Sequence, residues 1–240
     1  IFFAIPLMLG NICQQLYTMV DTMVVGQVAG VEALAALGAV DFLMWVVTGI
    51  STGLTQGFSI QLSQYYGAKD FENLRKSLAH SYRLTAFIAA GVLILSQSFA
   101  SLVLTGLHTP SNIIGMSLLY LRIIFCGIPA TAAYNMFASA LRAMGNSKTP
   151  LTAMIIASVL NVSLDILFVA GFGWGVAGAA IATVIAQSFS AVYCFLILRR
   201  IDIVHLTRAD FMPASGMNAR LMKLGIPVVF QNIIIGVGGL

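Results

Sequence analysis

Long runs of apolar residues are the feature that most limits what this chain can fold into. A run needs about 20 apolar residues to cross a bilayer as a helix. Six complete runs lie at residues 2–27, 33–64, 78–106, 113–141, 150–172 and 175–198, and a seventh begins near residue 219. With 59% hydrophobic and 8% charged residues, the chain also differs strongly from soluble globular proteins. We therefore predict an all-α integral membrane protein, a six-helix transmembrane bundle with the start of a seventh helix.

The basic residues orient this predicted bundle. Eleven of the twelve Lys and Arg residues follow the second, fourth and sixth runs. Because Lys and Arg are enriched in cytoplasmic loops, we predict that these connections and the N-terminus are cytoplasmic. The same asymmetry explains the formal charge of +4, so the charge is not interpreted as a sign of nucleic-acid binding.

A short internal sequence repeat predicts how the chain is divided into lobes. The segment "IPLMLGN" contains Pro6 and Asn11, and "IPVVFQN" contains Pro227 and Asn232 at the same separation. Such repeats are common in secondary transporters, whose substrate pathway lies between the two halves. The predicted divisions are a six-helix lobe at 1–198, a cytoplasmic linker at 199–218 and the start of a second lobe at 219–240. Because both ends of the sequence fall inside apolar runs, we interpret the chain as a fragment.

Polar side chains inside the runs mark a candidate pathway. A charged side chain at the bilayer centre costs about 2.5 to 3.5 kcal/mol on insertion scales, so it faces protein or water. Asp21 and Asp165 both lie in the outer halves of their runs, without a basic residue at their depth. Polar neighbours share their helical faces at spacings of three and four residues. These neighbours are Asn11, Gln14 and Thr18 in the first run, Ser158 and Asn161 in the fifth, and Thr183, Gln187 and Ser190 in the sixth.

Convergence of these three polar faces predicts a hydrated chamber within one six-helix unit. The alternative is that the polar groups only hydrogen-bond one helix to another. Arg122, the basic residue inside a run, either snorkels outward or pairs with an acid.

Glycine and proline predict how the helices pack and bend. Glycines recur every four residues in the second run, at Gly49, Gly53 and Gly57, which predicts the close approach of another helix. Pro6 and Pro129 fall inside predicted helices and each removes a backbone hydrogen bond. We therefore expect bends at these two prolines.

The sequence contains no signature of catalysis. Neither H-E-x-x-H nor G-x-S-x-G nor a phosphate-binding loop occurs, and the three His and three Cys residues do not have metal-ligand spacing. We expect a protein that is not an enzyme, that holds no cofactor, and that binds no metal unless Na⁺ is its coupling ion.

Several segments resemble the N-terminal half of the multidrug and toxic compound extrusion (MATE) transporters, most closely the DinF-like branch. These segments are "IPLMLGNICQQLYTMVDTMVVGQ", "SQYYGAKDFENLRK", "LRAMGNSKTP" and "LNVSLDILF". The resemblance implies twelve helices in two six-helix lobes around a central cleft. It also implies a multi-pass protein of the plasma or inner membrane that exports drugs and organic cations in exchange for H⁺ or Na⁺.

The resemblance further implies which residues form the site. The cation-binding cluster of the N-terminal lobe is matched by Asp21, Asn161, Asp165 and Thr183. Residues that line the cavity are matched by Tyr120 and Asn135, to which the polar faces add Gln14, Thr18 and Gln187. Pro6 matches the proline associated with bending of the first helix. Binding of H⁺ or Na⁺ to the cluster is then expected to favour a bent first helix and outward release of the drug.

Two other functions remain open from the sequence. A lipid-linked oligosaccharide flippase of the same superfamily predicts a larger and more cationic cavity, and the lack of basic residues at mid-membrane argues against it. A non-transporting membrane scaffold predicts that neutral replacements of Asp21 and Asp165 stabilise the bundle without functional loss. The expected partners are small organic cations or drugs and the lipid bilayer, with no nucleic acid, and the full-length chain is expected to be monomeric.

Overall fold

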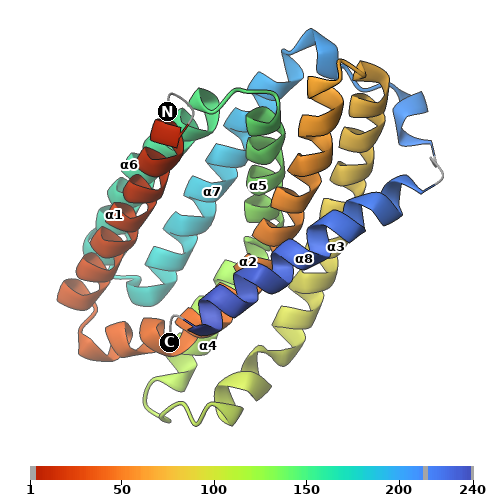
Figure 1. The fold of residues 1–240 in the computed structure, drawn as a ribbon. Coiled ribbons are helices and arrows are strands. Elements are labelled where there is room, and N and C mark those ends of the chain that lie inside the picture. Colours follow the sequence, from red (N-terminus) through yellow and green to blue (C-terminus); the bar gives the residue numbers. More distant parts are fainter. Residues whose placement is uncertain (1–3, 213–215, 239–240) are drawn as a thin grey trace.

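The computed structural model describes residues 4–212 and 216–238, and all regular structure in these residues is helical (Figure 1). The helices are α1 (Ala4–Val28), α2 (Val31–Gly67), α3 (Phe71–Gly106), α4 (Ile114–Cys126), α5 (Ile128–Ala143), α6 (Lys148–Asp165), α7 (Gly175–Arg199) and α8 (Met217–Gly238). A π-helix, η1 (Ile166–Gly171), continues α6, and two short 3₁₀-helices, η2 (Asp202–Val204) and η3 (Arg208–Phe211), precede α8. Each predicted apolar run is therefore helical, which confirms the predicted fold class.

Four helical segments of the described chain are long and apolar enough to cross a membrane: α2, α3, α6 with η1, and α7. The pair α4 and α5 makes a fifth span if the two helices are taken together across their 45° bend. This bend confirms the prediction at Pro129, which lies in the first turn of α5. The 25-residue α1 is not in this group.

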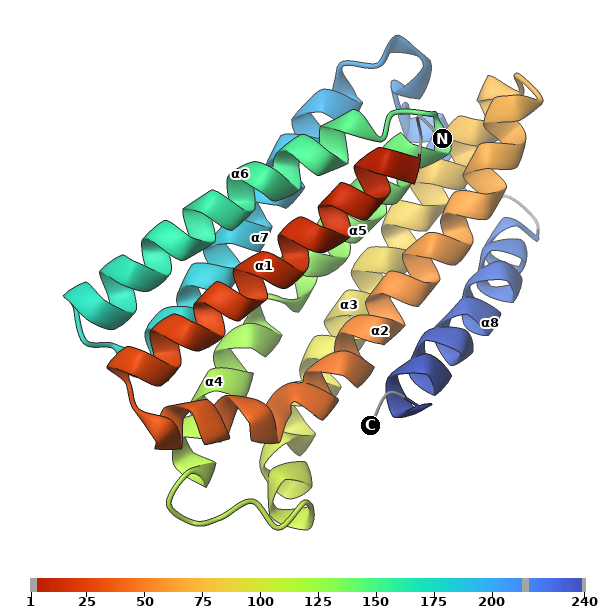
Figure 2. The same cartoon turned by 60° about the vertical axis from the view of Figure 1, so that its left-hand side comes forward.

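Helix α5 lies at the centre of the helix packing. Helix α5 packs against α2, α3 and α7, while α1 packs mainly against α6. Figure 2 shows α1 in front of α5, with α6 on one side and α2 on the other. The core has two clusters, which we call outer and inner after the membrane orientation predicted from the sequence. The outer cluster includes Leu37, Leu121 and Phe125, and the inner cluster includes Phe58 and Leu141. Helix α1 therefore closes one side of the space in which the site lies.

Short polar caps lie at the start of the helices α3 and α6. The side chain of Asp70 accepts hydrogen bonds from the backbone N–H of Asn73 at 3.1 Å and from its Nδ2 at 2.7 Å. These bonds, the side-chain one first, hold the pKa of the Asp70 carboxyl below its usual range. Asn146 accepts from the backbone N–H of Thr149 in the same way, at 3.1 Å. The caps fix where α3 and α6 enter the bundle.

Glycines on α2 allow α8 to pack directly against its backbone (Figure 1). A Cβ at Gly53 would lie 2.7 Å from the Cα of Val229, and a Cβ at Gly57 would lie 2.7 Å from the backbone nitrogen of Gly225. At Gly49 a Cβ would make only an ordinary contact, 4.0 Å from Cβ of Asn232. The predicted close approach is confirmed at Gly53 and Gly57, and the helix that makes it is α8.

The segment between α7 and α8 is bound to the first turns of α3. His80 on α3 is 1% exposed, with Nδ1 at 2.7 Å from Oδ1 of Asn218 and Nε2 at 3.1 Å from the carbonyl oxygen of Met212. Nearby, Arg83 donates to the carbonyl oxygen of Phe211 at 3.0 Å. These contacts fix the approach of the chain to α8. The division into lobes and linker stays a prediction.

We expect His80→Ala to loosen this segment in the full-length protein. The substitution removes both contacts of the imidazole, and hydrogen bonds of this kind contribute about 1 kcal/mol each. Limited proteolysis with trypsin should cleave at Arg208 about 30 times faster than in the wild type, because a loss of about 2 kcal/mol increases the open population by that factor. His205→Ala, at an exposed position of the same segment, is the matched control and should leave the rate unchanged. Equal rates for the two variants would show that His80 does not hold the segment.

Candidate functional site

A cavity of about 540 Å³ lies among α1, α2, α4, α5, α6 and α7, and we refer to it as the central cavity. Three predicted lining residues, Gln14, Asn135 and Gln187, line it. Asn135 also donates to Oγ1 of Thr52 at 3.2 Å, which joins α5 to α2 across one wall. The walls are therefore polar as well as apolar, as a site for an amphiphilic ligand requires.

The other two predicted lining residues lie outside this wall. Tyr120 on α4 is 9% exposed and belongs to the outer core cluster. Thr18 is exposed on α1, where its Oγ1 donates to the carbonyl oxygen of Gln14 at 2.9 Å. In the described conformation, neither side chain forms part of the lining.

Two buried acids adjoin the central cavity. Asp21 on α1 is 7% exposed, and Asp165, the last residue of α6, is 0% exposed. Both Oδ atoms of Asp165 and Oδ1 of Asp21 lack a hydrogen-bond partner in the described part of the chain. The helices that carry the two carboxyl groups are in contact, because α1 packs against α6 and η1. Buried polar atoms are nearly always satisfied in native proteins, so unpaired oxygens gathered here indicate a place for a proton or another cation.

Asn161 and Thr183 connect these acids with the central cavity. Asn161 lies one turn before Asp165 on the same face of α6, and its Nδ2 is 3.3 Å from Oγ1 of Thr183 on α7. Both residues line the cavity, and Oδ1 of Asn161 has no partner among the described residues. The structure thus places Asp21, Asn161, Asp165 and Thr183 in one region of α1, α6 and α7. We refer to these four residues as the acidic cluster.

The chemistry of the acidic cluster suits a proton or a hard cation. Its donor atoms are carboxylate, amide and hydroxyl oxygens, which bind hard cations in proteins. No group of three or more His, Cys, Asp or Glu side chains in residues 4–212 and 216–238 is arranged to hold a metal ion.

The backbone changes form directly after Asp165. Helix α6 continues as the π-helix η1, in which the N–H of Phe172 donates to the carbonyl oxygen of Leu167 at 2.9 Å. π-Helical turns are rare and occur frequently at functional sites. We find no residue pattern in 166–171 that predicts this change, so sequence reasoning missed it.

The sequence analysis also missed polar residues on α5. Tyr134, Ser139 and Arg142 all line the central cavity, although Arg142 was assigned to a cytoplasmic connection. Asn135, Ser139 and Arg142 recur at spacings of four and three residues, which places them on one face of the helix, and Tyr134 lies next to Asn135. This pattern was present in "AYNMFASALRA" and was the signal that could have found them.

The bend predicted at Pro6 stays a prediction. Pro6 is the third residue of α1 as described. The side chains of Pro6 and Asn11 lie outside the described part of the structure.

Comparison with known proteins assigns the chain to a family. The MatE family model matches residues 6–167, which include most of α1, all of α2 to α6, and the residues Asp21, Asn161 and Asp165. The chain belongs to the MatE family. This confirms the resemblance to the MATE family drawn from the sequence, and the members of that family are transporters and not enzymes.

Individual MatE relatives agree with this assignment. The chain is 31% identical to the probable multidrug resistance protein YpnP of Bacillus subtilis (strain 168) over 235 residues, which cover 98% of this chain and 53% of that protein. A crystal structure of MATE in the bent conformation superposes with a TM-score of 0.90 at 25% identity, over 97% of this chain and 52% of that one.

A MOP superfamily transporter from Pyrococcus furiosus, for which a reversed polarity of the binding pocket is described, superposes with a TM-score of 0.91. It is 25% identical, and the match covers 98% of this MatE chain and 52% of that one. The chain spans about half the length of the curated relatives it matches.

Proposed function

We propose that the full-length protein is a secondary antiporter that exports organic cations or drugs from the cell in exchange for H⁺ or Na⁺. The observation that carries this proposal is the pair of buried, unpaired carboxyl groups of Asp21 and Asp165 beside the central cavity. A salt bridge to a fixed basic residue would keep a carboxylate permanently neutralised. A carboxylate without such a partner can load and release a cation, which is what antiport requires.

The acidic cluster joins the helices that must move. Asp21 belongs to α1, while Asn161, Asp165 and Thr183 belong to α6 and α7. A bound cation attracts oxygens from all three helices, so it favours a conformation in which they lie close together. Since a ligand shifts a conformational equilibrium only through different affinities for the two states, this contact supplies the coupling. Helix α1, which packs mainly against α6, is the element proposed to move.

Asn161 and Thr183 are proposed to transmit the state of the ion site to the substrate. Asn161 lies one turn before Asp165 on α6 and donates a hydrogen bond to Thr183 on α7. Both side chains also line the central cavity. A cation on Asp165 draws Oδ1 of Asn161 toward it and changes the polar wall that a substrate contacts. The names of YpnP and the other multidrug relatives support a drug as the substrate.

The cellular placement is also part of the proposal. The distribution of basic residues supports a cytoplasmic N-terminus and a plasma or inner membrane location. Because two lobes of one chain enclose the cleft in the implied fold, we propose a monomer. The oligosaccharide flippase alternative predicts a strongly cationic cavity, and one basic residue, Arg142, is found in the described lining.

The test is transport by the full-length protein in vesicles whose membrane potential is clamped. Rhodamine 123, a fluorescent organic cation, should be moved faster when an opposing gradient of H⁺ or of Na⁺ is imposed, and collapse of that gradient should stop the flux. The ion whose gradient works identifies the coupling ion. Flux that depends on neither gradient would contradict the proposed antiport.

A further inference from the structure

We propose that the inner end of the central cavity is an anion-binding subsite, formed by Arg142, Tyr134 and Ser139, that takes the carboxylate of a zwitterionic organic substrate. The inference rests on the proposed function and deepens it, because it names a class of substrate. We refer to these three residues as the anion subsite.

Arg142 brings an uncompensated positive charge to the cavity wall. It lies in the last turn of α5, is half-buried and lines the central cavity. Its Nη2 donates to Oγ of Ser139 at 3.1 Å, but the described chain holds no carboxylate within ion-pair distance of the guanidinium. The titratable groups that act on it are the tyrosine Tyr134 and the thiol Cys194. A partly desolvated guanidinium is stabilised by an oxyanion, with which it forms paired, charge-assisted hydrogen bonds.

Tyr134 and Ser139 offer further donors beside this charge. Tyr134 is 7% exposed, lines the cavity, and its hydroxyl oxygen has no hydrogen-bond partner in the described residues. Ser139 is 2% exposed and accepts the bond from Arg142, so its own hydroxyl hydrogen is available for a ligand. A buried hydroxyl without a partner is unfavourable. An oxyanion that accepts from both hydroxyl groups and the guanidinium satisfies all three.

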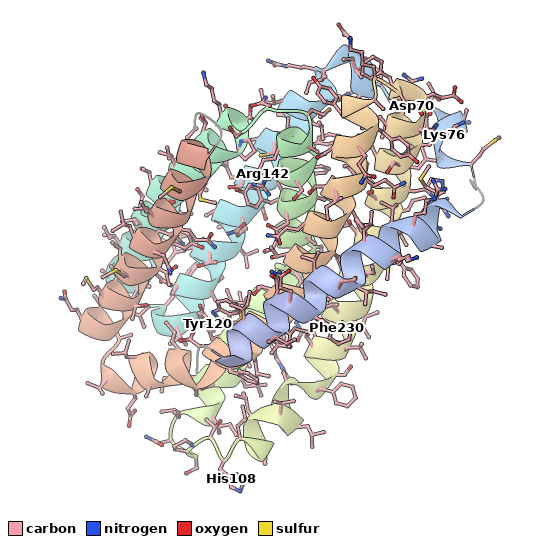
Figure 3. All side chains as sticks on the ribbon, viewed as in Figure 1. Asp70, Lys76, His108, Tyr120, Arg142 and Phe230 are labelled. Atoms are coloured by element: carbon pink, nitrogen blue, oxygen red, sulfur yellow. The ribbon has the colours of Figure 1, made fainter. Side chains whose placement is uncertain are left out.

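The anion subsite and the acidic cluster lie at opposite ends of the bundle. Asp165 ends the 18-residue α6, roughly 25 Å from the cytoplasmic start of that helix at 1.5 Å per residue. Arg142 lies just before the turn that leads into α6, so it is close to that cytoplasmic start. Figure 3 shows Arg142 toward the upper end of the bundle, the end that carries Asp70, with Tyr120 much lower. A substrate with a cationic and an anionic group therefore matches the cavity in one orientation, with its anionic group toward Arg142 and its cationic group toward the acidic cluster.

The dipole of α5 does not by itself explain Arg142. A cation near a helix C-terminus contributes about 0.3 to 1 kcal/mol and needs no burial for this. Arg199 in the same chain shows this, because it also lies in the last turn of a helix, α7, and is exposed. Arg142 instead points into the cavity beside an unsatisfied hydroxyl.

Two dyes that differ by one methyl ester test the proposal. Rhodamine 110 carries a free carboxylate and is a zwitterion at neutral pH, while rhodamine 123 is its methyl ester and is a cation. Affinities of both are measured on the full-length protein in vesicles of zwitterionic lipid, so that no anionic headgroup competes for Arg142. Arg142→Gln is expected to weaken rhodamine 110 binding by about 10- to 100-fold, the range of a lost charge-assisted hydrogen bond. It should strengthen rhodamine 123 binding about two-fold, because a like charge leaves the cavity.

Arg122→Gln is the matched control, since Arg122 is exposed on α4 and does not line the cavity. It should change neither affinity. Tyr134→Phe, which removes one oxygen atom, should weaken rhodamine 110 several-fold and leave the cation less affected, and it decides the matter if Arg142→Gln does not fold. An equal loss of both dyes, or no loss of rhodamine 110 in either variant, overturns the anion subsite. Gradient-driven rhodamine 123 flux in the wild type tests the antiport separately, so failure of one proposal is distinguishable from failure of the other.

Discussion

Asp165→Asn is expected to reduce gradient-driven export of rhodamine 123 by at least about 100-fold in the full-length protein, with no loss of folded protein. The amide has nearly the volume of the carboxyl group but cannot exchange a proton or balance the charge of Na⁺. Removing a charge from a site that is 0% exposed also relieves a desolvation cost, so thermal stability should hold or rise. Function and stability thus change in opposite directions, which a merely structural aspartate would not produce.

Asp41→Asn is the control for this experiment. Asp41 is exposed on α2 and does not belong to the acidic cluster, so its variant should export the dye at the wild-type rate. Undiminished export by Asp165→Asn would contradict the assignment of the ion site. It would favour the scaffold alternative, which predicts stabilisation without functional loss.

Gly57→Ala is expected to lower the free energy of unfolding by about 3 kcal/mol, the upper part of the usual range for overpacking. The added methyl group would meet Gly225 through its backbone and not through a flexible side chain, so α8 must shift as a whole. Thermal unfolding of the full-length protein in detergent should show the loss as a lower midpoint temperature.

Gly38→Ala makes the same chemical change on the same helix. No atom lies within 4 Å of the added Cβ at Gly38, and alanine is favoured over glycine in a helix interior by about 0.5 to 1 kcal/mol. This variant should therefore be as stable as the wild type or more stable. If both variants shift the midpoint in the same direction, contact with α8 is not what Gly57 provides.

The fold followed largely from the apolar runs. A helix satisfies every backbone hydrogen bond within its own segment, which is why long apolar runs predict membrane helices well. The site was partly predictable for the same reason, because Asp21 and Asp165 stand out in surroundings where a charge is unfavourable. The position of Asn161 on the same helical face as Asp165 was also evident from the sequence.

Tertiary packing determined what the sequence did not reveal. From the sequence, Arg142 was assigned to a connection because it directly follows the fourth apolar run. The structure shows that it belongs to the last turn of α5 and faces the central cavity. The glycines of α2 predicted a close neighbour but could not name α8, since any helix with a small residue at the crossing would fit. The π-helix after Asp165 depends on how α6 packs and not on a local residue pattern.

The most direct measurement of the central claim is cation binding to the purified full-length protein. Proton uptake in weakly buffered solution and binding of radioactive Na⁺ are measured for the wild type, Asp21→Asn and Asp165→Asn, in the absence of substrate. If the acidic cluster is the ion site, the wild type binds one of these cations and Asp165→Asn loses that binding. A variant that binds the same ion with wild-type stoichiometry and affinity would show that the cluster is not where the coupling cation binds.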